Sequence, residues 1–328
     1  MFRRITIFIL IAIAFLHSLP GQPYKNLVME GGGIRGIAYA GAIGVLDTFG
    51  ILKSIENVAG TSAGAIQGMG IAVGYNSSEM KTIMQEVKWE HLNDGSLVFL
   101  GGSMRMIQNY GWYPGMALRG WADDILFQKT GIHNLTFFQL DSLKKTHSEM
   151  KNLFVIASNL TLQKPIELSF RTYPKMCISD AINASAAIPL YYEPVIINSQ
   201  GKRMEKNKAD SSCYYLVDGG LLANYPYFIF DSLPGKTLGL MLDRPDQLER
   251  SSNGQADFPI RNISDFSEAC YNSVLEMQTK RIWTPVMEKN TVRISVGNIG
   301  PRIRKMKKEE VEMLVNNGRV ATLKFLHH

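Results

Sequence analysis

The sequence predicts an α/β protein with a mostly parallel central sheet. Apolar strand candidates at residues 25–29 (KNLVM) and within 51–59 each lead through a glycine-containing turn into small residues with helical spacing, at 34–46 and 65–73. Strand, turn and helix repeated in this way are typical of parallel sheets, because parallel neighbours need a helical crossover. The length of 328 residues allows one large domain with an appendage.

Elements farther along the chain fit the same architecture. Residues 77–150 have helical periodicity that Gly and Pro clusters interrupt. The further expected elements are a buried strand at 153–158, an Ala-rich helix at 178–187, an exposed polar loop at 200–212, strands at 214–217 and 237–242, a loop at 244–259, two helices with a short strand at 292–296, and a last helix at 306–326. We therefore expect one α/β domain over 22–245 and a mainly helical C-terminal extension over 246–328.

The N-terminus has the pattern of a secretory signal peptide. Arg3 and Arg4 precede an apolar run at 5–16, and a polar, turn-like segment follows up to Gly21. The run is too short to span a bilayer, which needs about 20 residues. We expect a signal peptide over 1–21 and export to the periplasm, the outer membrane or the medium. An uncleaved leader would instead anchor the protein in the membrane.

Composition narrows the partners. The net charge of +6 is modest and permits contact with an anionic membrane surface. The sequence has no basic arm, zinc motif or RNA-binding signature, so we expect no nucleic-acid partner. Cys177, Cys213 and Cys270 are too few for a disulfide scaffold and too scattered for a metal site. One disulfide with a spare thiol and three buried thiols both fit the count.

The glycines at 31–36 (GGGIRG) permit three interpretations. Gly31, Gly33 and Gly36 match G-x-G-x-x-G, which follows a strand and opens a helix in dinucleotide-binding domains. Glu56 lies near the expected place of the ribose-binding acid, but it precedes an apolar pair instead of ending a strand. The same backbone N–H groups can also stabilise a developing oxyanion. Tight packing of a turn on a helix is the third interpretation.

The segment at 60–64 (GTSAG) predicts a nucleophilic serine. It matches G-x-S-x-G between an expected strand and an expected helix, where flanking Gly60 and Gly64 permit the strained turn that exposes the Ser62 hydroxyl. A serine N-cap in a turn of small residues is the simpler alternative.

A nucleophilic serine needs a base, and a carboxylate fits better than a histidine. Only His327 and His328 follow a plausible acid in Ser–Asp–His order, and they are the last residues of the chain. Asp218 ends an expected strand, and Gly219 and Gly220 follow it in VDGG. The alternative for this segment is a hairpin turn, since Asp-Gly is a strong hairpin signal.

Together these segments resemble the patatin-like phospholipase family. GGGIRG at 31–36, GTSAG at 60–64 and DGGLLANYP at 218–226 occur in the family's order, with NASAAIPLYYEPV at 183–195 as a supporting segment. The resemblance covers about 25–245 and implies a three-layer α/β/α fold. Glu30 before the glycines is a small departure from the family pattern.

The resemblance also implies an active site. Ser62 would be the nucleophile and Asp218 its base, without a histidine, and Gly31, Gly32 and Gly33 would form the oxyanion hole. Supporting positions would be Arg35, Gly36, Gly60, Gly64, Gly219 and Gly220. Two roles stay open for Arg35: it buttresses the glycine loop, or it binds an anionic head group. The implied chemistry needs no metal or other cofactor.

The implied substrate is an acyl-ester lipid at a membrane surface, such as a phospholipid, a lysophospholipid or a neutral lipid. The aromatic segment at 106–121 fits an acyl groove or interfacial lid, or simple packing of a helical cap. The basic residues at 302–308 fit lipid contact or a solvated helix start. A catalytically silent membrane-binding or effector protein on the same fold is the main alternative, and a dinucleotide-binding protein is the weaker one. Protein partners stay open.

Overall fold

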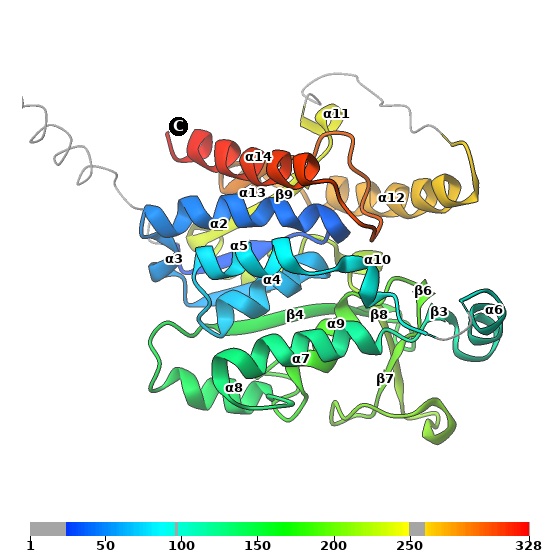
Figure 1. The fold of residues 1–328 in the computed structure, drawn as a ribbon. Helices are drawn as coiled ribbons and strands as arrows, with labels where there is room; N and C mark the ends of the chain where they lie inside the picture. The colour runs from blue at the N-terminus through cyan, green and yellow to red at the C-terminus, as the bar shows by residue number, and fades with distance from the viewer. Residues whose placement is uncertain (1–23, 96–97, 249–259, 328) are drawn as a thin grey trace, which may run out of the picture.

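The computed structural model describes residues 24–95, 98–248 and 260–327. The expected signal peptide at 1–21 and most of the expected loop at 244–259 lie outside the described residues. Figure 1 shows a sheet with helices on both of its faces, so the predicted three-layer α/β/α fold is confirmed.

The main sheet of the described chain has eight strands. Its order is β10-β9-β1-β2-β4-β8-β7, with β5 also paired to β4. The strands are β1 (Asn26–Met29), β2 (Asn57–Thr61), β4 (Asn152–Asn159), β5 (Lys164–Ser169), β7 (Val195–Ile197), β8 (Tyr214–Asp218), β9 (Thr237–Asp243) and β10 (Thr291–Ser295). Pairing is parallel from β10 to β4 and antiparallel for β5, β8 and β7. A small second sheet joins β3 (Gly111–Tyr113) to β6 (Leu190–Tyr192).

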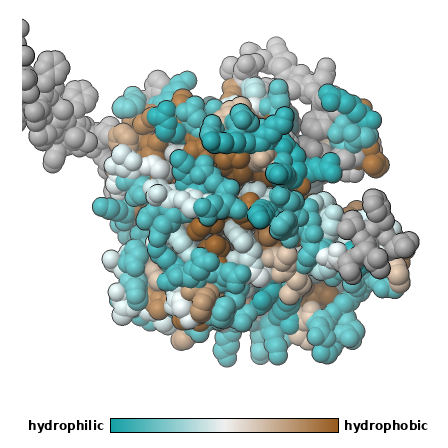
Figure 2. Space-filling model, viewed as in Figure 1, coloured by the Kyte–Doolittle hydropathy of each residue, from teal (hydrophilic) through white to brown (hydrophobic). Residues whose placement is uncertain are grey.

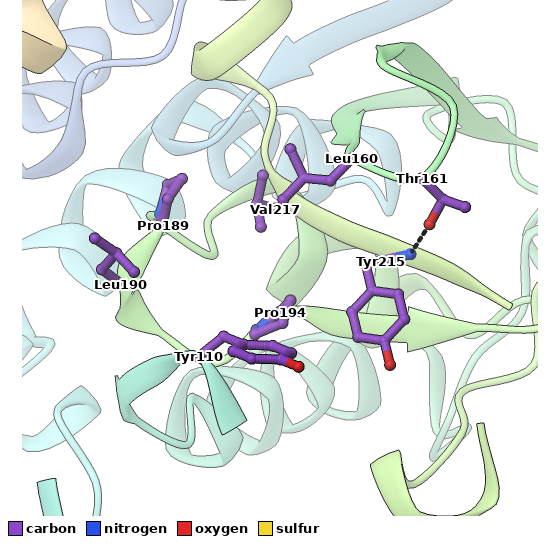
Figure 3. Close-up of a pocket in the computed structure, with 8 residues that line it drawn as sticks. All are labelled: Tyr110, Leu160, Thr161, Pro189, Leu190, Pro194, Tyr215 and Val217. Carbon is purple, nitrogen blue, oxygen red and sulfur yellow. Dashed lines mark hydrogen bonds between the residues drawn. The ribbon is translucent and has the colours of Figure 1, made fainter. Parts of the chain in front are cut away.

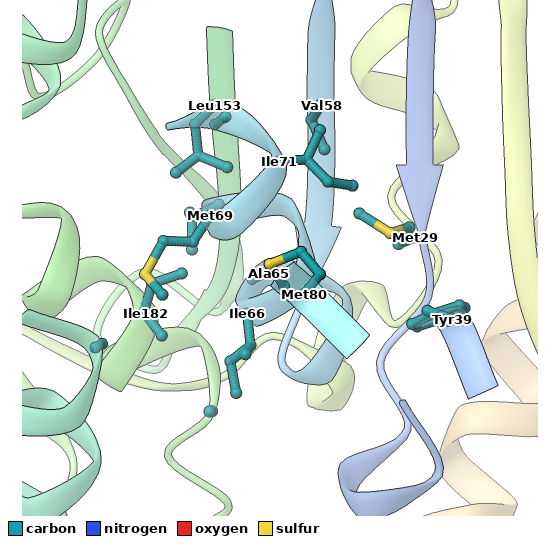
Figure 4. Packing of buried hydrophobic residues seen from close by; sticks show 14 of the residues in the cluster. Met29, Tyr39, Val58, Ala65, Ile66, Met69, Ile71, Met80, Leu153 and Ile182 are labelled. Carbon is teal, nitrogen blue, oxygen red and sulfur yellow. The ribbon is translucent and has the colours of Figure 1, made fainter. Parts of the chain in front are cut away.

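Alternation along the strands divides the core into two layers. Leu27 and Met29 of β1 belong to the larger cluster of buried side chains, whereas Val28 between them belongs to the smaller cluster on the opposite face. Figure 4 shows the larger cluster, to which Met29 and Val58 of the sheet and Met69 of a covering helix all belong.

The helices cover both faces. The larger-cluster face is covered by helices that include α2 (Ala38–Thr48), α4 (Ala63–Ala72), α9 (Ile178–Ser185) and α14 (Lys308–Leu326). On the smaller-cluster side lie η4 (Tyr227–Phe230) and α13 (Pro285–Lys289), and α10 (Gly220–Ala223) carries α12 (Ile263–Ile282). The other helices are η1 (Gly33–Ile37), α3 (Ile51–Ser54), α5 (Ser77–Glu86), η2 (Trp89–Leu92), α6 (Val98–Asn109), α7 (Met116–Thr130), α8 (Phe137–Lys144), η3 (Lys206–Lys208), η5 (Pro234–Lys236) and α11 (Pro245–Leu248).

The chain beyond residue 246 shares the main sheet. Strand β10 pairs in parallel with β9, and α14 packs along α2 (Figure 1). The expected single helix at 34–46 is a 3-10 turn, η1, followed by α2. Strands β3, β5, β6 and β7 have no counterpart among the expected elements. They are short or lack a clear apolar run, so periodicity alone does not reveal them.

Other expectations concern cysteines and membrane spans. The three cysteines are free thiols, with Cys213 buried, Cys177 partly buried and Cys270 exposed, so neither a disulfide nor three buried thiols is correct. Within 24–95, 98–248 and 260–327, no helix has the length and apolar character needed to cross a bilayer.

Figure 2 shows a mostly hydrophilic face on which hydrophobic side chains appear between the helices.

Candidate active site

The register of strand β4 brings Ser62 and Asp218 together. One edge of β4 is taken by β5, which pairs with both Ile156 and Ala157. On the other edge, Thr61 at the end of β2 pairs with Ile156, and Asp218 at the end of β8 pairs with Ala157. Strands β2 and β8 therefore run toward each other along the same edge. Their ends meet at adjacent positions of β4, and Ser62 follows at once.

Ser62 lies in a strained elbow between β2 and α4. Its backbone has φ 51° and ψ −118°, a conformation that costs free energy for a residue with a side chain. Its N–H donates to the Ser185 hydroxyl at 2.8 Å, which in turn donates to the Ile156 carbonyl at 2.5 Å. A Cβ at Gly64 would lie 2.3 Å from the Met29 carbonyl oxygen, so only glycine permits this close approach of α4 to β1. The serine is therefore held by its surroundings and is not a simple N-cap; no side-chain cap bond forms.

Asp218 is buried with hydrogen-bond donors around it. Its side chain accepts from the Gly220 N–H at 2.7 Å and the Tyr271 hydroxyl at 3.2 Å, both through Oδ1, and the nearby Ser62 hydroxyl acts on its pKa as a donor. Only 2% of the residue is exposed. Burial raises the pKa of Asp218 to about 6, and the hydrogen bonds from Ser62, Gly220 and Tyr271 limit the rise. The hairpin alternative is wrong, because α10 follows and Gly219 has a right-handed helical φ of −61°.

The glycine loop passes directly beside Ser62. A Cβ at Gly31 would lie 3.4 Å from the Ser62 Cβ. The Gly31 N–H already donates to the Asn224 carbonyl at 3.0 Å, so the expectation of three available oxyanion donors is corrected for this residue. The Gly32 and Gly33 N–H groups have no acceptor among the residues that the structure describes. The supporting glycines Gly36, Gly60 and Gly219 line the same corner, where added Cβ atoms would meet Ala63, Gly64 and Ile156.

Arg35 is hydrogen-bonded to the backbone of the glycine loop. Its side chain is buried, and its Nε donates to the Gly32 carbonyl at 3.1 Å. This contact favours the buttress role over a head-group role. Glu30 lies in the same layer, where its two carboxyl oxygens accept from Asn224 Nδ2 and the Leu242 N–H, each at 2.9 Å. Burial, followed by the charge of Asp243, raises the pKa of Glu30 to about 8.

The competing motifs do not form sites. Glu56 precedes β2, at the opposite end of the strands from the glycine loop, and pairs with Lys25 at 2.5 Å on the surface. It therefore cannot serve the glycine loop as a ribose-binding acid. No histidine among the described residues contacts Ser62 or Asp218: His133 bonds Asp123 at 2.9 Å, and His91 and His147 are exposed. Nor do the described residues include a cluster of His, Cys, Asp or Glu that could hold a metal ion.

An apolar cavity of about 380 Å³ lies next to the Asp218 strand. Figure 3 shows its walls, which include Val217 immediately before Asp218, Leu190, and Tyr110 from the 106–121 segment. The rest of that segment is divided among the end of α6, strand β3 and α7, so one part lines a cavity and other parts pack. In the basic segment, Arg304 pairs with Glu310 at 2.6 Å and Lys307 caps α14, which is the arrangement of a helix start.

Two residues of this corner were absent from the sequence prediction. Ser185 lies inside the segment NASAAIP, but its part in holding the Ser62 N–H depends on how α9 meets β4. Tyr271 lies in α12, where no motif surrounds it. A polar side chain on an otherwise unremarkable helix gives no signal until the helix is placed against the site.

Comparisons with known proteins identify the family. The model of the patatin-like phospholipase family matches residues 27–231, which include the glycine loop, Ser62 and Asp218. The protein YqhO of Bacillus subtilis is 30% identical over 286 residues, covering 84% of this chain and 89% of YqhO. The "Probable lipid hydrolase 463L" of Invertebrate iridescent virus 6 is 26% identical over 212 residues, covering 64% of each protein.

Solved structures share the fold. VipD from Legionella pneumophila superposes with a TM-score of 0.61 at 19% identity, covering 93% of this chain and 67% of that chain. ExoU in its complex with SpcU from Pseudomonas aeruginosa gives a TM-score of 0.55 at 18% identity, covering 93% of this chain and 51% of ExoU. The present chain thus spans about half of that ExoU chain. Since the family model covers well over half of the sequence, the chain belongs to the patatin-like phospholipase family.

Proposed function

We propose that this protein is a lipid acyl hydrolase in which Ser62 attacks the ester and Asp218 is its base. The observation that carries the proposal is the meeting of β2 and β8 along one edge of β4, which puts the Ser62 hydroxyl close enough to the buried Asp218 carboxyl to lower its pKa. A strained, fixed serine beside a base is the arrangement that nucleophilic catalysis needs. Membership of a phospholipase family supports an acyl-ester lipid as the substrate.

The chemistry follows from these positions. The Ser62 Oγ attacks the ester carbonyl carbon while Asp218 takes the hydroxyl proton. The oxyanion of the tetrahedral intermediate accepts hydrogen bonds from the Gly32 and Gly33 N–H groups. The C–O bond to the alcohol then breaks, Asp218 returns the proton to the leaving oxygen, and an acyl-Ser62 ester remains. A water that gives its proton to Asp218 attacks this ester, and the fatty acid leaves with Ser62 reprotonated.

The pKa of Asp218 suits a base at neutral pH. A value of about 6 leaves the carboxyl mostly ionised at pH 7, yet more basic than an ordinary aspartate. The free enzyme has to hold Asp218 as a carboxylate, so kcat/KM should fall as the pH drops through about 6. The apolar cavity beside Val217 supports a site for an acyl chain, and a membrane surface would present such chains.

The test is fatty-acid release from mixed phospholipid vesicles in the presence of EDTA. Wild type is compared with Ser62→Ala, Asp218→Asn and the control Ser142→Ala, an exposed serine on α8. We expect release by wild type and the control, with both site variants near background. Activity that survives Ser62→Ala would contradict the nucleophile. If wild type releases nothing from vesicles or from a short-chain ester, the silent membrane-binding or effector alternative replaces the proposal.

We also propose export through residues 1–21, on the signal-peptide pattern alone. N-terminal sequencing of protein recovered from each cell fraction tests it. A mature chain that begins near residue 22 outside the cytoplasm supports cleavage, whereas a full-length membrane-bound chain supports an anchor.

A further inference from the structure

Helix α12 is hydrogen-bonded to Asp218 and to the turn that follows it. The Tyr271 hydroxyl donates to Asp218 Oδ1 at 3.2 Å, and two turns later Gln278 Nε2 donates to the Leu221 carbonyl at 2.5 Å. Gln278 Oε1 also accepts from the Asn224 N–H at 3.2 Å. One face of α12 thus contacts both the base and the α10 turn behind it. The helix lies outside the residues that match the family model.

Only glycine fits at position 220, between helix α12 and the Asp218 carboxyl group. A Cβ at Gly220 would lie 2.6 Å from the Tyr271 hydroxyl and 2.9 Å from Asp218 Oδ1. The glycine therefore does more than turn the chain after the aspartate, since it admits the tyrosine hydroxyl to the carboxyl group.

We propose that Tyr271 is a positioning residue of the active site, whose hydroxyl orients the Asp218 carboxylate toward Ser62 and stabilises its ionised form. This inference rests on the proposed function. It adds to the Ser62–Asp218 pair a third group, supplied from the C-terminal part of the chain.

The hydrogen bonds give this role a physical basis. Gly220 and Tyr271 both donate to Oδ1, which leaves Oδ2 free of these two donors. A donor favours the charged form of a buried carboxyl group, and the Tyr271 hydrogen bond lowers the pKa of Asp218 against the effect of burial. Among the described residues, Asp218 interacts with the hydroxyls of Ser62 and Tyr271 and the Gly220 amide, and no charged side chain acts on it. Burial and the charge of Asp218 raise the pKa of Tyr271 well above 10, so it stays a donor throughout the working range.

The test is the pH profile of kcat/KM for Tyr271→Phe, which removes only the hydroxyl. We expect its acid limb to shift to higher pH by about half a pH unit or more. The loss is then about threefold near pH 5, where the base is mostly protonated, and smaller near pH 8. Tyr75→Phe is the matched control, because it removes another buried hydroxyl, one that donates to the Ile125 carbonyl at 2.9 Å far along the chain from Asp218. Its acid limb should stay where the wild-type limb is.

A second measurement does not depend on turnover. Carbon NMR titration of labelled aspartate carboxyl groups, with Asp218 assigned by its loss in Asp218→Asn, gives the Asp218 pKa directly. Tyr271→Phe should raise it, and Tyr75→Phe should not. A uniform loss of activity with an unchanged acid limb and an unchanged Asp218 pKa would overturn the inference and leave a packing role. Activity that persists in Ser62→Ala would instead overturn the proposed function, while the NMR result would still decide whether Tyr271 acts on Asp218.

Discussion

Two buried carboxyl groups lie at the ends of strands in the same sheet, and they differ in their hydrogen-bond partners. Glu30 follows β1 and Asp218 ends β8, and burial raises the pKa of both, to about 8 and about 6. The two Glu30 carboxyl oxygens accept from the Asn224 side-chain amide and the Leu242 backbone N–H. The charged neighbours of Glu30 are Arg35 and Asp243. Asp218 accepts from the Gly220 N–H and the Tyr271 hydroxyl, and unlike Glu30 it lies beside a serine hydroxyl, that of Ser62 in its strained elbow.

This comparison teaches which observation identifies a base. Ranked by the change in pKa alone, Glu30 would be the stronger candidate. A catalytic base must also reach the proton that it removes, so the contact has to be considered before the pKa. Glu30 supports the loop that would hold the oxyanion, whereas Asp218 faces Ser62, the proposed nucleophile.

The largest expected effect separates the two carboxyl groups by activity. Asp218→Asn should lower kcat by about 10⁴-fold or more, since an amide cannot take the Ser62 proton. Glu30→Gln keeps one carbonyl oxygen for Asn224 or Leu242, and we expect it to retain activity within about tenfold. Vesicle assays of both variants at pH 7.5 measure the difference. Comparable losses in the two variants would mean that the glycine loop, and not the base, dominates the rate.

The two carboxyl groups should also lower the stability of the folded protein as the pH rises, each over its own pH interval. A carboxyl group whose pKa is raised on folding keeps its proton in the native state after the unfolded chain has lost it, so stability falls with rising pH between the two values. For Asp218 the interval is 3.8 to about 6, and for Glu30 it is 4.5 to about 8. Above these intervals Asp218→Asn should gain about 3 kcal/mol at most relative to wild type, while losing activity.

Denaturant unfolding near pH 5 and pH 8 measures this effect. The gain of Glu30→Gln should be smaller than its pKa implies, because the new amide N–H₂ would face a donor, either Leu242 N–H or Asn224 Nδ2. If Asp218→Asn is no more stable than wild type at pH 8, its carboxylate is better solvated or better hydrogen-bonded than the structure indicates.

Much of this arrangement was predictable from sequence, for identifiable reasons. The glycine loop and the serine elbow are local, so spacing within a few residues predicts them, and the family and fold are confirmed. The meeting of β2 with β8 is not local. It depends on which residues of β4 each strand pairs with, and β2 and β8 themselves lie more than 100 positions apart in the sequence.

Hydrogen-bond occupancy was the other gap. Nothing in the string GGG distinguishes Gly31, whose N–H is taken by Asn224, from Gly32 and Gly33. Tyr271 likewise gains its meaning only from the way α12 docks on α10. The roles of Ser62 and Asp218 stay predictions until the variants are assayed.

An effect of intermediate size is expected when alanine replaces a glycine of the loop beside Glu30, compared with the same replacement in a helix. Gly33 has φ +56°, and an added Cβ would lie 2.0 Å from the Pro301 carbonyl oxygen. Gly33→Ala should therefore destabilise the fold by about 2 kcal/mol or more and displace an oxyanion donor. Gly44→Ala on α2 is the control, since its Cβ would meet nothing within 4 Å, and it should be neutral or stabilising by up to about 1 kcal/mol. Thermal unfolding and vesicle hydrolysis of both variants make the test; equal behaviour would argue that the loop adjusts freely.

The smallest expected effect concerns the cavity, which adjoins the Asp218 strand and includes no residue of the Glu30 loop. Leu160→Trp should fill part of it and lower the ratio of long-chain to short-chain ester hydrolysis by about tenfold, with the short-chain rate close to wild type. Leu162→Trp, two residues farther on and exposed, is the control that should leave the ratio unchanged. An unchanged ratio in Leu160→Trp would place the acyl chain elsewhere, and the Asp218 side would then differ from the Glu30 side by the serine contact alone. A lowered ratio would place the acyl chain in this cavity, whose wall includes Tyr215 and Val217 of the strand that ends at Asp218, so the substrate chain would lie directly beside the carboxyl group proposed as the base.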